Sequence, residues 1–410
     1  MTHRSSDAID SDRRVLVTYA WVRSSYAVLR NLTDHGIRVW AADLYRTGMC
    51  QSSRRSAGFV RYPTPYADEP AFVRFIANAC RERGIGLVFP SHNETEVLAR
   101  HRELLPPGAD RLLPSAEHCA LFNHKAATYS LAESLGLRVP RRVLYRDPSE
   151  IPRLARDMGT RDLVIKLLTG NSARGVVYGS TAEQAQRKVD WMIERYALPP
   201  SRYPQVEERV TGDGAGCSVL YWHGRRIATF CHRRLRERVW TGGTSTLRES
   251  IASPELEQAA CRLFDHVGWH GLAMSEFKLA ADGGAPWFIE VNPRLWGSLP
   301  LAVSAGVEFP YLLWCCAVLG PDAAIEHDRR VEKRIGHRAR WLWGDCMLAL
   351  SQVMRLHPVE ATHTLLQTRA DSLDDLHQDD MGAFRGELMR YAVRAFTGRS
   401  RARTREGALR

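Results

Sequence analysis

Apolar and polar positions along the first third of the chain follow two alternating patterns. Short runs that are almost wholly apolar, typical of buried strands, are separated by stretches in which apolar residues recur every three or four positions, typical of helices. The expected strands occupy residues 15–19, 37–43, 59–63, 86–90 and 111–114. Strands that alternate with helices predict a parallel sheet covered by helices. We therefore expect a small parallel α/β domain over residues 14–115, after a disordered lead-in over residues 1–13.

The order of elements changes after this domain. A helix that follows Lys125 is closed by Gly136, and the next strands are joined by short polar or glycine-containing turns. This mixture predicts an α+β domain over residues 116–320, followed by a helical extension over residues 321–396 and a basic tail over residues 397–410. Further helices are expected over residues 181–196, 254–267, 338–355 and 384–396.

Residues 271–294 have the pattern of a β-hairpin. Two apolar-rich runs flank Asp282-Gly-Gly, and glycine supplies the positive φ that a tight turn needs. If the chain folds back at Gly283, Glu276 falls opposite Glu290, with the two carboxylates roughly 5 Å apart. Like charges at this separation repel each other, so the pairing calls for a compensating group.

A hard divalent cation would compensate the two carboxylates. Asn292 lies two positions beyond Glu290 and therefore on the same face of the strand. Oxygen atoms are the ligands that Mg²⁺ takes, and this ion commonly bridges to substrate phosphates. Arg294 follows with a fixed charge that suits a phosphate or carboxylate. The alternative is that both glutamates point into solvent on an exposed hairpin, and the adjoining Asn-Pro-Arg favours the cation site.

The first strand–helix junction excludes a dinucleotide site of the usual kind. Such sites place a glycine-rich turn after the first strand and an acid after the second. The acid is present as Asp43, but the first turn, from Thr18 to Ser25, contains no glycine. We therefore exclude NAD binding. The polar residues Ser91 to Glu94 follow a later strand, at the sheet edge where open α/β folds bind ligands.

Composition places the chain among globular proteins. It has 410 residues, of which 44% are hydrophobic and 25% charged, so two or three domains are expected. No apolar run reaches the length of a membrane span, and the N-terminus lacks the apolar core of a signal peptide. Nine cysteines without a Cys-x-x-Cys pattern indicate reduced thiols and a cytoplasmic protein. His and Cys never cluster at ligand spacing along the sequence, so no zinc site is expected.

The net charge of +11 is concentrated at the C-terminus. Residues 390–410 contain seven arginines and one acid, Glu406, and so carry more than half of the excess. A solvated basic tail explains this better than a nucleic-acid-binding domain, although RNA, anionic lipid or an acidic partner could bind such a tail. A second basic segment, His232 to Arg238, precedes a glycine-containing stretch that ends at Ser245. We expect this segment to face a substrate, with a solvated strand face as the alternative.

Four separate blocks of sequence carry a family resemblance. They are Asn123-His-Lys125 with the following helix and Gly136-Leu-Arg-Val-Pro140; Val164-Ile-Lys166 before the small-residue loop 169–175; Glu207-Glu208-Arg-Val210-Thr-Gly212; and Glu276 with Glu290-Val-Asn292-Pro-Arg294. Their order and spacing resemble the ATP-grasp superfamily, and most of all its carboxylate–amine ligase-like branch with the predicted ATP-grasp carboligases. The resemblance covers residues 14–320. It implies an N-terminal parallel α/β pre-ATP-grasp domain, a two-lobed ATP-grasp domain and a small helical C-terminal extension. The small lobe would cover about 140–205 and the large lobe about 206–320.

The resemblance also implies roles for individual residues. Lys125 and Lys166 would hold the phosphates of ATP, and the loop with Gly170, Ser172 and Gly175 would close over the β- and γ-phosphates. The hinge of Glu207, Glu208 and Val210 would meet the adenine edge and the ribose, with the choice between the two glutamates left open. The ligands of Mg²⁺ (or Mn²⁺) would be Glu276, Glu290 and Asn292. Arg294 would steady the transferring phosphoryl group and is the candidate catalytic residue.

The implied reaction joins a carboxylate to an amine. ATP would phosphorylate the carboxylate, and the amine would then displace phosphate to give an amide, with ADP released. One alternative uses bicarbonate as the carboxylate, as biotin carboxylase-like members do, and another is a regulatory protein that binds nucleotide without turnover. The expected partners are small-molecule carboxylate and amine substrates, and a homodimer is possible because dimers are common in the family. Specificity is expected from residues 232–245, 91–94 and 296–298.

Overall fold

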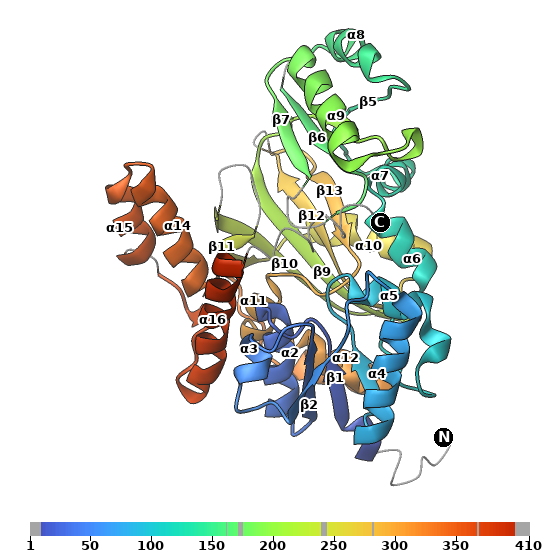
Figure 1. Cartoon of the computed structure of the whole chain (residues 1–410), viewed down its shortest axis with the longest axis vertical. Helices are drawn as coiled ribbons and strands as arrows, with labels where there is room; N and C mark the ends of the chain where they lie inside the picture. Colours follow the sequence, from blue (N-terminus) through green and yellow to red (C-terminus); the bar gives the residue numbers. More distant parts are fainter. Residues whose placement is uncertain are drawn as a thin grey trace.

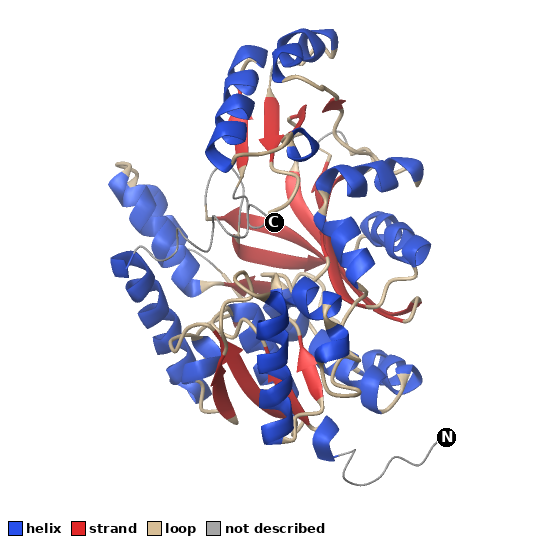
Figure 2. Ribbon diagram, turned by 45° about the vertical axis from the view of Figure 1, so that its right-hand side comes forward, coloured by secondary structure: helices blue, strands red, loops and turns tan. Residues whose placement is uncertain are grey.

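Three β-sheets organise the chain, with helices packed around them (Figure 1). The computed structural model describes residues 10–160, 162–170, 175–238, 244–280, 283–366 and 369–397. Two four-stranded sheets lie toward opposite ends of the long axis, and a seven-stranded sheet lies between them. Figure 2 shows the strands within each layer and the helices mainly on the outside. None of the helices in the described ranges is long and apolar enough to cross a membrane.

The N-terminal sheet is parallel, with the strand order β3-β2-β1-β4. Its strands are β1 (Arg14–Val17), β2 (Arg38–Asp43), β3 (Gly58–Arg61) and β4 (Leu87–Phe89). The helices of this part of the chain are α2 (Arg23–Asp34), α3 (Met49–Ser52), α4 (Glu69–Arg83), α5 (Glu94–Arg100), α6 (Ala116–Asn123) and α7 (Lys125–Ser134). Local signals bound α4: the Asp68 side chain accepts a hydrogen bond from the Ala71 N–H, and Gly84 ends the helix with φ 60°. The expected parallel α/β architecture is confirmed.

The strand expected over residues 111–114 is wrong. The Arg111 N–H donates to the Gly108 carbonyl and the Leu113 N–H to the Asp110 carbonyl, so the segment consists of turns. Leu113 is buried, which explains the apolar run, but local bonds satisfy the backbone in place of a neighbouring strand. The ordered chain also begins before residue 14. Residues 10–12 form a helical turn, and buried Asp12 binds Arg111.

The large sheet has the order β13-β12-β9-β10-β11-β14-β15. Its first five strands are β9 (Asp213–Trp222), β10 (Arg225–Glu237), β11 (Ser245–Ile251), β12 (Gly271–Leu279) and β13 (Trp287–Asn292). The helices beside it are α10 (Pro254–Val267), α11 (Leu299–Ser304), α12 (Phe309–Val318) and α13 (Pro321–Arg330). Its two faces pack into separate cores because strand residues alternate: Leu220 lies in the core shared with the N-terminal sheet, whereas Val219 and Tyr221 lie in the core with α10.

The small sheet has the order β5-β8-β6-β7 and packs against its own helices. Its strands are β5 (Arg142–Val143), β6 (Leu163–Lys166), β7 (Val176–Gly179) and β8 (Gln205–Glu208), and its helices are α8 (Ile151–Asp157) and α9 (Ala182–Tyr196). The Thr181 side chain caps α9 by accepting from the Gln184 N–H. Because β8 pairs with β5 and β6, the small lobe extends past the expected boundary at residue 205.

The C-terminal extension is less purely helical than expected. It contains α14 (Leu342–Met354), α15 (Pro358–Leu366) and α16 (Met381–Thr397), together with β14 (Arg338–Arg340) and β15 (Ser372–Leu373). The helix expected over residues 338–355 is wrong at its start, because residues 338–340 pair with β11 as an added strand of the large sheet. The basic tail beyond Thr397 lies outside the described residues.

Candidate functional site

A cavity of about 440 Å³ lies between the small sheet and the large sheet. Residues of β6, β7 and β8 line one side, and residues of β10, β12 and β13 line the other. All three predicted metal ligands, the hinge residues and Arg294 reach this cavity. The predicted residues that line it are Lys166, Glu207, Glu208, Val210, Glu276, Glu290, Asn292 and Arg294.

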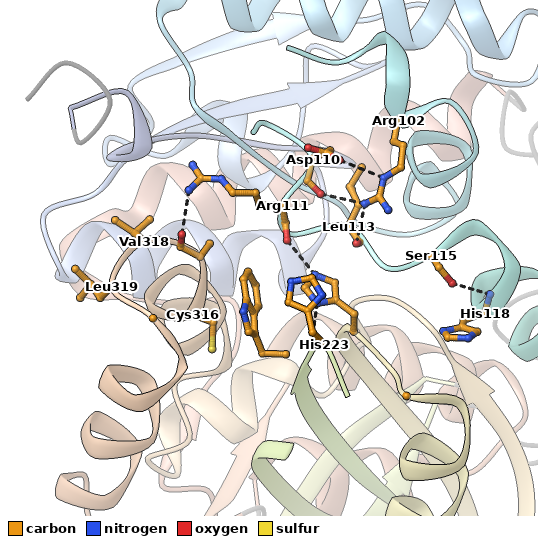
Figure 3. A pocket seen from close by; sticks show the side chains of 15 residues that line it. Arg102, Asp110, Arg111, Leu113, Ser115, His118, His223, Cys316, Val318 and Leu319 are labelled. Carbon is orange, nitrogen blue, oxygen red and sulfur yellow. Dashed lines mark hydrogen bonds and ion pairs between the residues drawn. The ribbon is translucent and has the colours of Figure 1, made fainter. Parts of the chain in front are cut away.

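A larger cavity of about 940 Å³ lies elsewhere and has a different character (Figure 3). It runs along the seam between the segment 102–118, the turn at His223 and the end of α12. The dashed lines in Figure 3 mark hydrogen bonds and ion pairs of several of its polar side chains. The Arg111 guanidinium donates to the Ala317 carbonyl at 2.9 Å, and His270 Nε2 donates to the Arg111 carbonyl at 3.0 Å. None of the described site residues predicted from the sequence lines this cavity, so the candidate site is the cavity between the small and large sheets.

The hairpin of β12 and β13 opposes the two predicted carboxylates, as its sequence indicated. Glu276 pairs with Glu290 across the ladder, and Asn292 pairs with Met274. The Asn292 amide donates to Glu276 Oε1 at 3.0 Å, so these two side chains lie on the same face of the hairpin. Gly283 has φ 70°, as the turn requires, whereas Asp282 lies outside the described residues.

Basic side chains neutralise both carboxylates. Lys125 Nζ lies 3.0 Å from Glu290 Oε2, and Arg234 Nη2 lies 2.6 Å from Glu276 Oε2. Arg294 Nη2 donates to Asn292 Oδ1 at 2.7 Å. Burial raises the pKa of Glu290, but the facing Lys125 outweighs burial and holds the pKa below its usual value. Glu290 is therefore held ionised beside Lys125, and a divalent ion could enter this cluster by displacing Lys125 and Arg234.

The structure separates the two hinge glutamates. Glu207 is buried, with Oε1 2.5 Å from Lys166 Nζ, and it accepts a further hydrogen bond from Gln205 at 2.7 Å. Glu208 instead accepts from the backbone N–H and the guanidinium of Arg141, at 3.0 and 2.8 Å. Glu207 therefore orients the lysine of the cavity, and Glu208 fastens β8 to the segment before β5.

Glycines shape the two loops at the edge of the cavity. Gly175 has φ 81°, and a Cβ there would come within 2.6 Å of Leu167 Cδ1. The Leu167 N–H donates to the Gly175 carbonyl at 2.9 Å and closes the base of the loop that contains Gly170. Ser172, the third predicted residue of that loop, lies outside the described residues. At Gly212, φ is 139° and a Cβ would lie 1.9 Å from the Leu279 carbonyl oxygen, so only glycine fits after the hinge.

Only some arginines of the basic segment 232–238 face the cavity, a difference that the sequence analysis did not predict. Arg234 and Arg236 line the cavity, whereas Arg233 binds Glu249 at 2.7 Å. Arg236 Nε donates at 3.0 Å to Asp345 of the C-terminal extension. Because side chains alternate along a strand, the sequence could have predicted that Arg233 lies on one face and Arg234 and Arg236 on the other. It could not have predicted the ion pairs with Glu276 and Asp345, which depend on tertiary contacts.

The carboxyl edge of the N-terminal sheet approaches the same site. Tyr19 follows β1 and His92 follows β4, and their rings stack with centroids 4.2 Å apart. Both residues have positive φ, 51° and 59°, a costly conformation for residues with a Cβ. Tyr19 also interacts electrostatically with Arg294, a guanidinium whose pKa is lowered by burial. Residues 91–94 follow β4 at this edge of the sheet, and their expected role in binding a ligand stays a prediction.

His232 makes the protein sensitive to acid. Its ring is buried beside the Ser298 hydroxyl, 3.1 Å from Nε2, and burial lowers its pKa from 6.5 to about 3. Between pH 6.5 and pH 3, His232 is therefore protonated in the unfolded chain but not in the folded one. Stability should fall as the pH decreases through this interval. We expect the free energy of unfolding to lose up to about 1.4 kcal/mol per pH unit through this group.

Urea unfolding across this pH range measures the effect. His232→Gln should flatten the dependence, while His363→Gln, at an exposed position, should leave it unchanged. An unchanged slope in His232→Gln would show that the buried ring does not carry this effect.

Comparisons with known proteins agree on the fold. Residues 206–342 match the family model described as "ATP-grasp in the biosynthetic pathway with Ter operon". The search of curated proteins gave no match. Among solved structures, biotin carboxylase from Campylobacter jejuni is similar with a TM-score of 0.60 and 14% identity, over 80% of this chain and 74% of that one. The L-amino acid ligase from Bacillus licheniformis is similar with a TM-score of 0.58 and 16% identity, over 79% and 78% of the two chains.

A third structure extends this group. The biotin carboxylase domain dimer of the Hydrogenobacter thermophilus 2-oxoglutarate carboxylase, in complex with MgADP, ADP and bicarbonate, has a TM-score of 0.58 and 16% identity, over 80% and 73% of the two chains. At these identities the likeness concerns architecture. With the family-model match and the three-sheet arrangement, it identifies the fold of this chain as that of the ATP-grasp superfamily.

Proposed function

We propose that the chain is an ATP-dependent carboxylate–amine ligase that uses Mg²⁺ or Mn²⁺ and releases ADP and phosphate. The observation that carries the proposal is the set of three oxygen-bearing side chains, Glu276, Glu290 and Asn292, packed among cations in the cavity between the lobes. MgADP in the 2-oxoglutarate carboxylase structure and the ligase activity named for the Bacillus licheniformis protein support the same chemistry for this fold.

The cations of the cavity suit the phosphates of ATP. Lys125 and Lys166 are mobile point charges, and each is held here by a carboxylate that a bound nucleotide would replace or reorient. Glu276, Glu290 and Asn292 would hold the divalent ion, which supplies charge neutralisation for the phosphoryl group when bound. Arg294, buried beside Asn292, would stabilise the negative charge that is transferred.

The adenine end of the nucleotide would lie at β8. Val210 and the backbone of the hinge line the cavity next to Lys166. Glu207 would keep the lysine aimed at the phosphates, a positioning role that follows from their 2.5 Å contact. The loop between Gly170 and Gly175 would cover the β- and γ-phosphates with backbone N–H groups.

The two organic substrates would arrive from the N-terminal side of Arg294. The stacked pair Tyr19 and His92 stands at the carboxyl edge of the parallel sheet, where open α/β folds bind ligands. Arg236 adds a guanidinium to the cavity wall, held by Asp345. A substrate with a second carboxylate, such as an amino acid or a short peptide, fits these charges.

Bicarbonate is the second candidate for the activated carboxylate, because two of the similar structures are biotin carboxylases. The distinguishing feature is the acceptor. Incubation with MgATP and pools of amino acids, other carboxylates and amines should release ADP only when a carboxylate and an amine are both present. ADP release that needs bicarbonate and no amine would favour the carboxylase reaction. Nucleotide binding without turnover in broad pools would favour a regulatory protein and contradict the proposal.

A further inference from the structure

Two histidines and a glutamate meet where the N-terminal domain packs on α12 and α13. His35 caps the C-terminus of α2, Glu308 precedes α12, and His327 lies in α13. His35 Nε2 is 3.0 Å from Glu308 Oε1, and His327 Nε2 is 2.7 Å from Glu308 Oε2. One ligand atom from each residue can be chosen so that all three lie within 4.8 Å of one another. Two imidazoles and one carboxylate are a donor set that Zn²⁺ takes in proteins.

Neighbouring groups hold these three side chains in place. The Tyr311 ring stacks on His35 with centroids 3.5 Å apart and meets His327 edge-on at 4.8 Å. The Asn31 amide donates to Glu308 Oε1 at 2.7 Å, and its own Oδ1 accepts from the Tyr311 N–H at 2.9 Å. Ring orientation and carboxylate position are thus fixed by partners outside the cluster, as is usual around metal ligands.

The distances and exposure leave room for an ion. Ligands at about 2.0–2.1 Å from a tetrahedral ion are about 3.3 Å from one another. The nitrogen–oxygen separations of 2.7 and 3.0 Å, which involve the two different oxygens of Glu308, need to open by a few tenths of an ångström, and the three ligand atoms, now within 4.8 Å of one another, must draw together around the ion. Side-chain exposures of 20% to 27% leave solvent access for a water as the fourth ligand.

We propose that His35, Glu308 and His327 form a binding site for a divalent transition-metal ion, with zinc as the fitting ion. The site is separate from the magnesium ligands, because Mg²⁺ takes oxygen donors whereas this cluster offers two nitrogens. Each imidazole would lose its Nε2 proton and bind the ion through that nitrogen. Glu308 would exchange its hydrogen bonds to the two imidazoles for a bond to the ion. A bound ion would join α2 of the N-terminal domain to α12 and α13, and would stabilise that junction.

Zinc titration of the full chain, without a polyhistidine tag and stripped with a chelator, tests the proposal. A competition assay with a chromophoric chelator should give one tight zinc site, and Co²⁺ should give the visible absorption of a tetrahedral complex. Zinc should also raise the melting temperature. His327→Ala should weaken zinc binding by about 100-fold or more and abolish the thermal shift. Two control variants should keep both the zinc affinity and the thermal shift. His363→Ala removes an exposed histidine, and Glu290→Gln changes the cavity between the small and large sheets.

Two outcomes of the zinc titration would overturn the proposed metal site. Zinc binding weaker than about 10 μM, or equal binding in His327→Ala and the parent chain, would leave a hydrogen-bonded cluster only. His327→Gln serves as a second variant if the alanine variant unfolds, since it keeps a polar group of similar size. Turnover of MgATP should be the same in His327→Ala and the parent chain, so failure of this site and failure of the proposed ligase activity are distinguished.

Discussion

Replacing Glu290 by glutamine should abolish ADP formation while the protein stays folded. The substitution keeps the size of the side chain but removes the charge that pairs with Lys125 and is proposed to bind the divalent ion. Removing one such electrostatic contact should lower turnover by about 100- to 1,000-fold or more. Single-turnover ADP release at saturating MgATP measures the loss, and circular dichroism checks the fold.

Glu249→Gln is the matched control for this experiment. Glu249 is also a largely buried glutamate of the large sheet, held by Arg233 and Arg338 at 2.7 and 2.8 Å, and it does not line the cavity among the described residues. Its replacement should leave turnover near the parent value. Retention of more than a tenth of the activity in Glu290→Gln would refute its assignment as a metal ligand.

Replacing Lys166 by methionine should affect both turnover and stability, by two separable routes. Glu207 would then be a buried carboxylate without its cation, and breaking a buried pair from one side costs about 3–5 kcal/mol of unfolding free energy. ATP turnover should be lost at the same time, because one of the two phosphate-binding cations is gone. The double variant with Glu207→Gln should regain most of the stability and none of the turnover.

Urea unfolding and ADP release, measured on the single and double variants, separate the two routes. Arg153→Met removes the cation of an exposed ion pair with Asp157 and should change neither quantity by much. A double variant that recovers turnover would show that Lys166 does not bind phosphate. A single variant as stable as the parent would show that the Lys166–Glu207 pair is less desolvated than its burial indicates.

Local sequence signals are sufficient to specify the ends of some helices and the register of the β12–β13 hairpin. The bounds of α4 and α10 follow from residues at their ends, Asp68 and Gly84 in one and Ser253 and Gly268 in the other. The opposition of Glu276 and Glu290 follows from a turn and a period of two. These features depend on a few consecutive residues, so the chain specifies them before any tertiary contact forms.

The same signals fail where a segment is apolar for a reason other than strand or helix formation. Residues 111–114 bury their leucines while their backbone bonds locally, and residues 338–340 pair with β11, a strand about ninety residues earlier in the chain. Amphipathic pattern alone assigns both segments to the wrong element, because burial does not reveal which partner satisfies the backbone.

The sequence by itself determined the parallel N-terminal sheet, the carboxylate hairpin and the resemblance of four sequence blocks to the ATP-grasp superfamily. Only the tertiary structure decided which group each charge meets: Lys166 with Glu207, Arg234 with Glu276, and His35 and His327 with Glu308. Spacing along the chain indicated no zinc site, since nearly three hundred residues separate His35 from Glu308 and His327, the other two residues of the proposed site. The physical reason is that backbone preference and side-chain period act over a few residues, whereas ion pairs and metal ligands are brought together by the packing of whole sheets and helices.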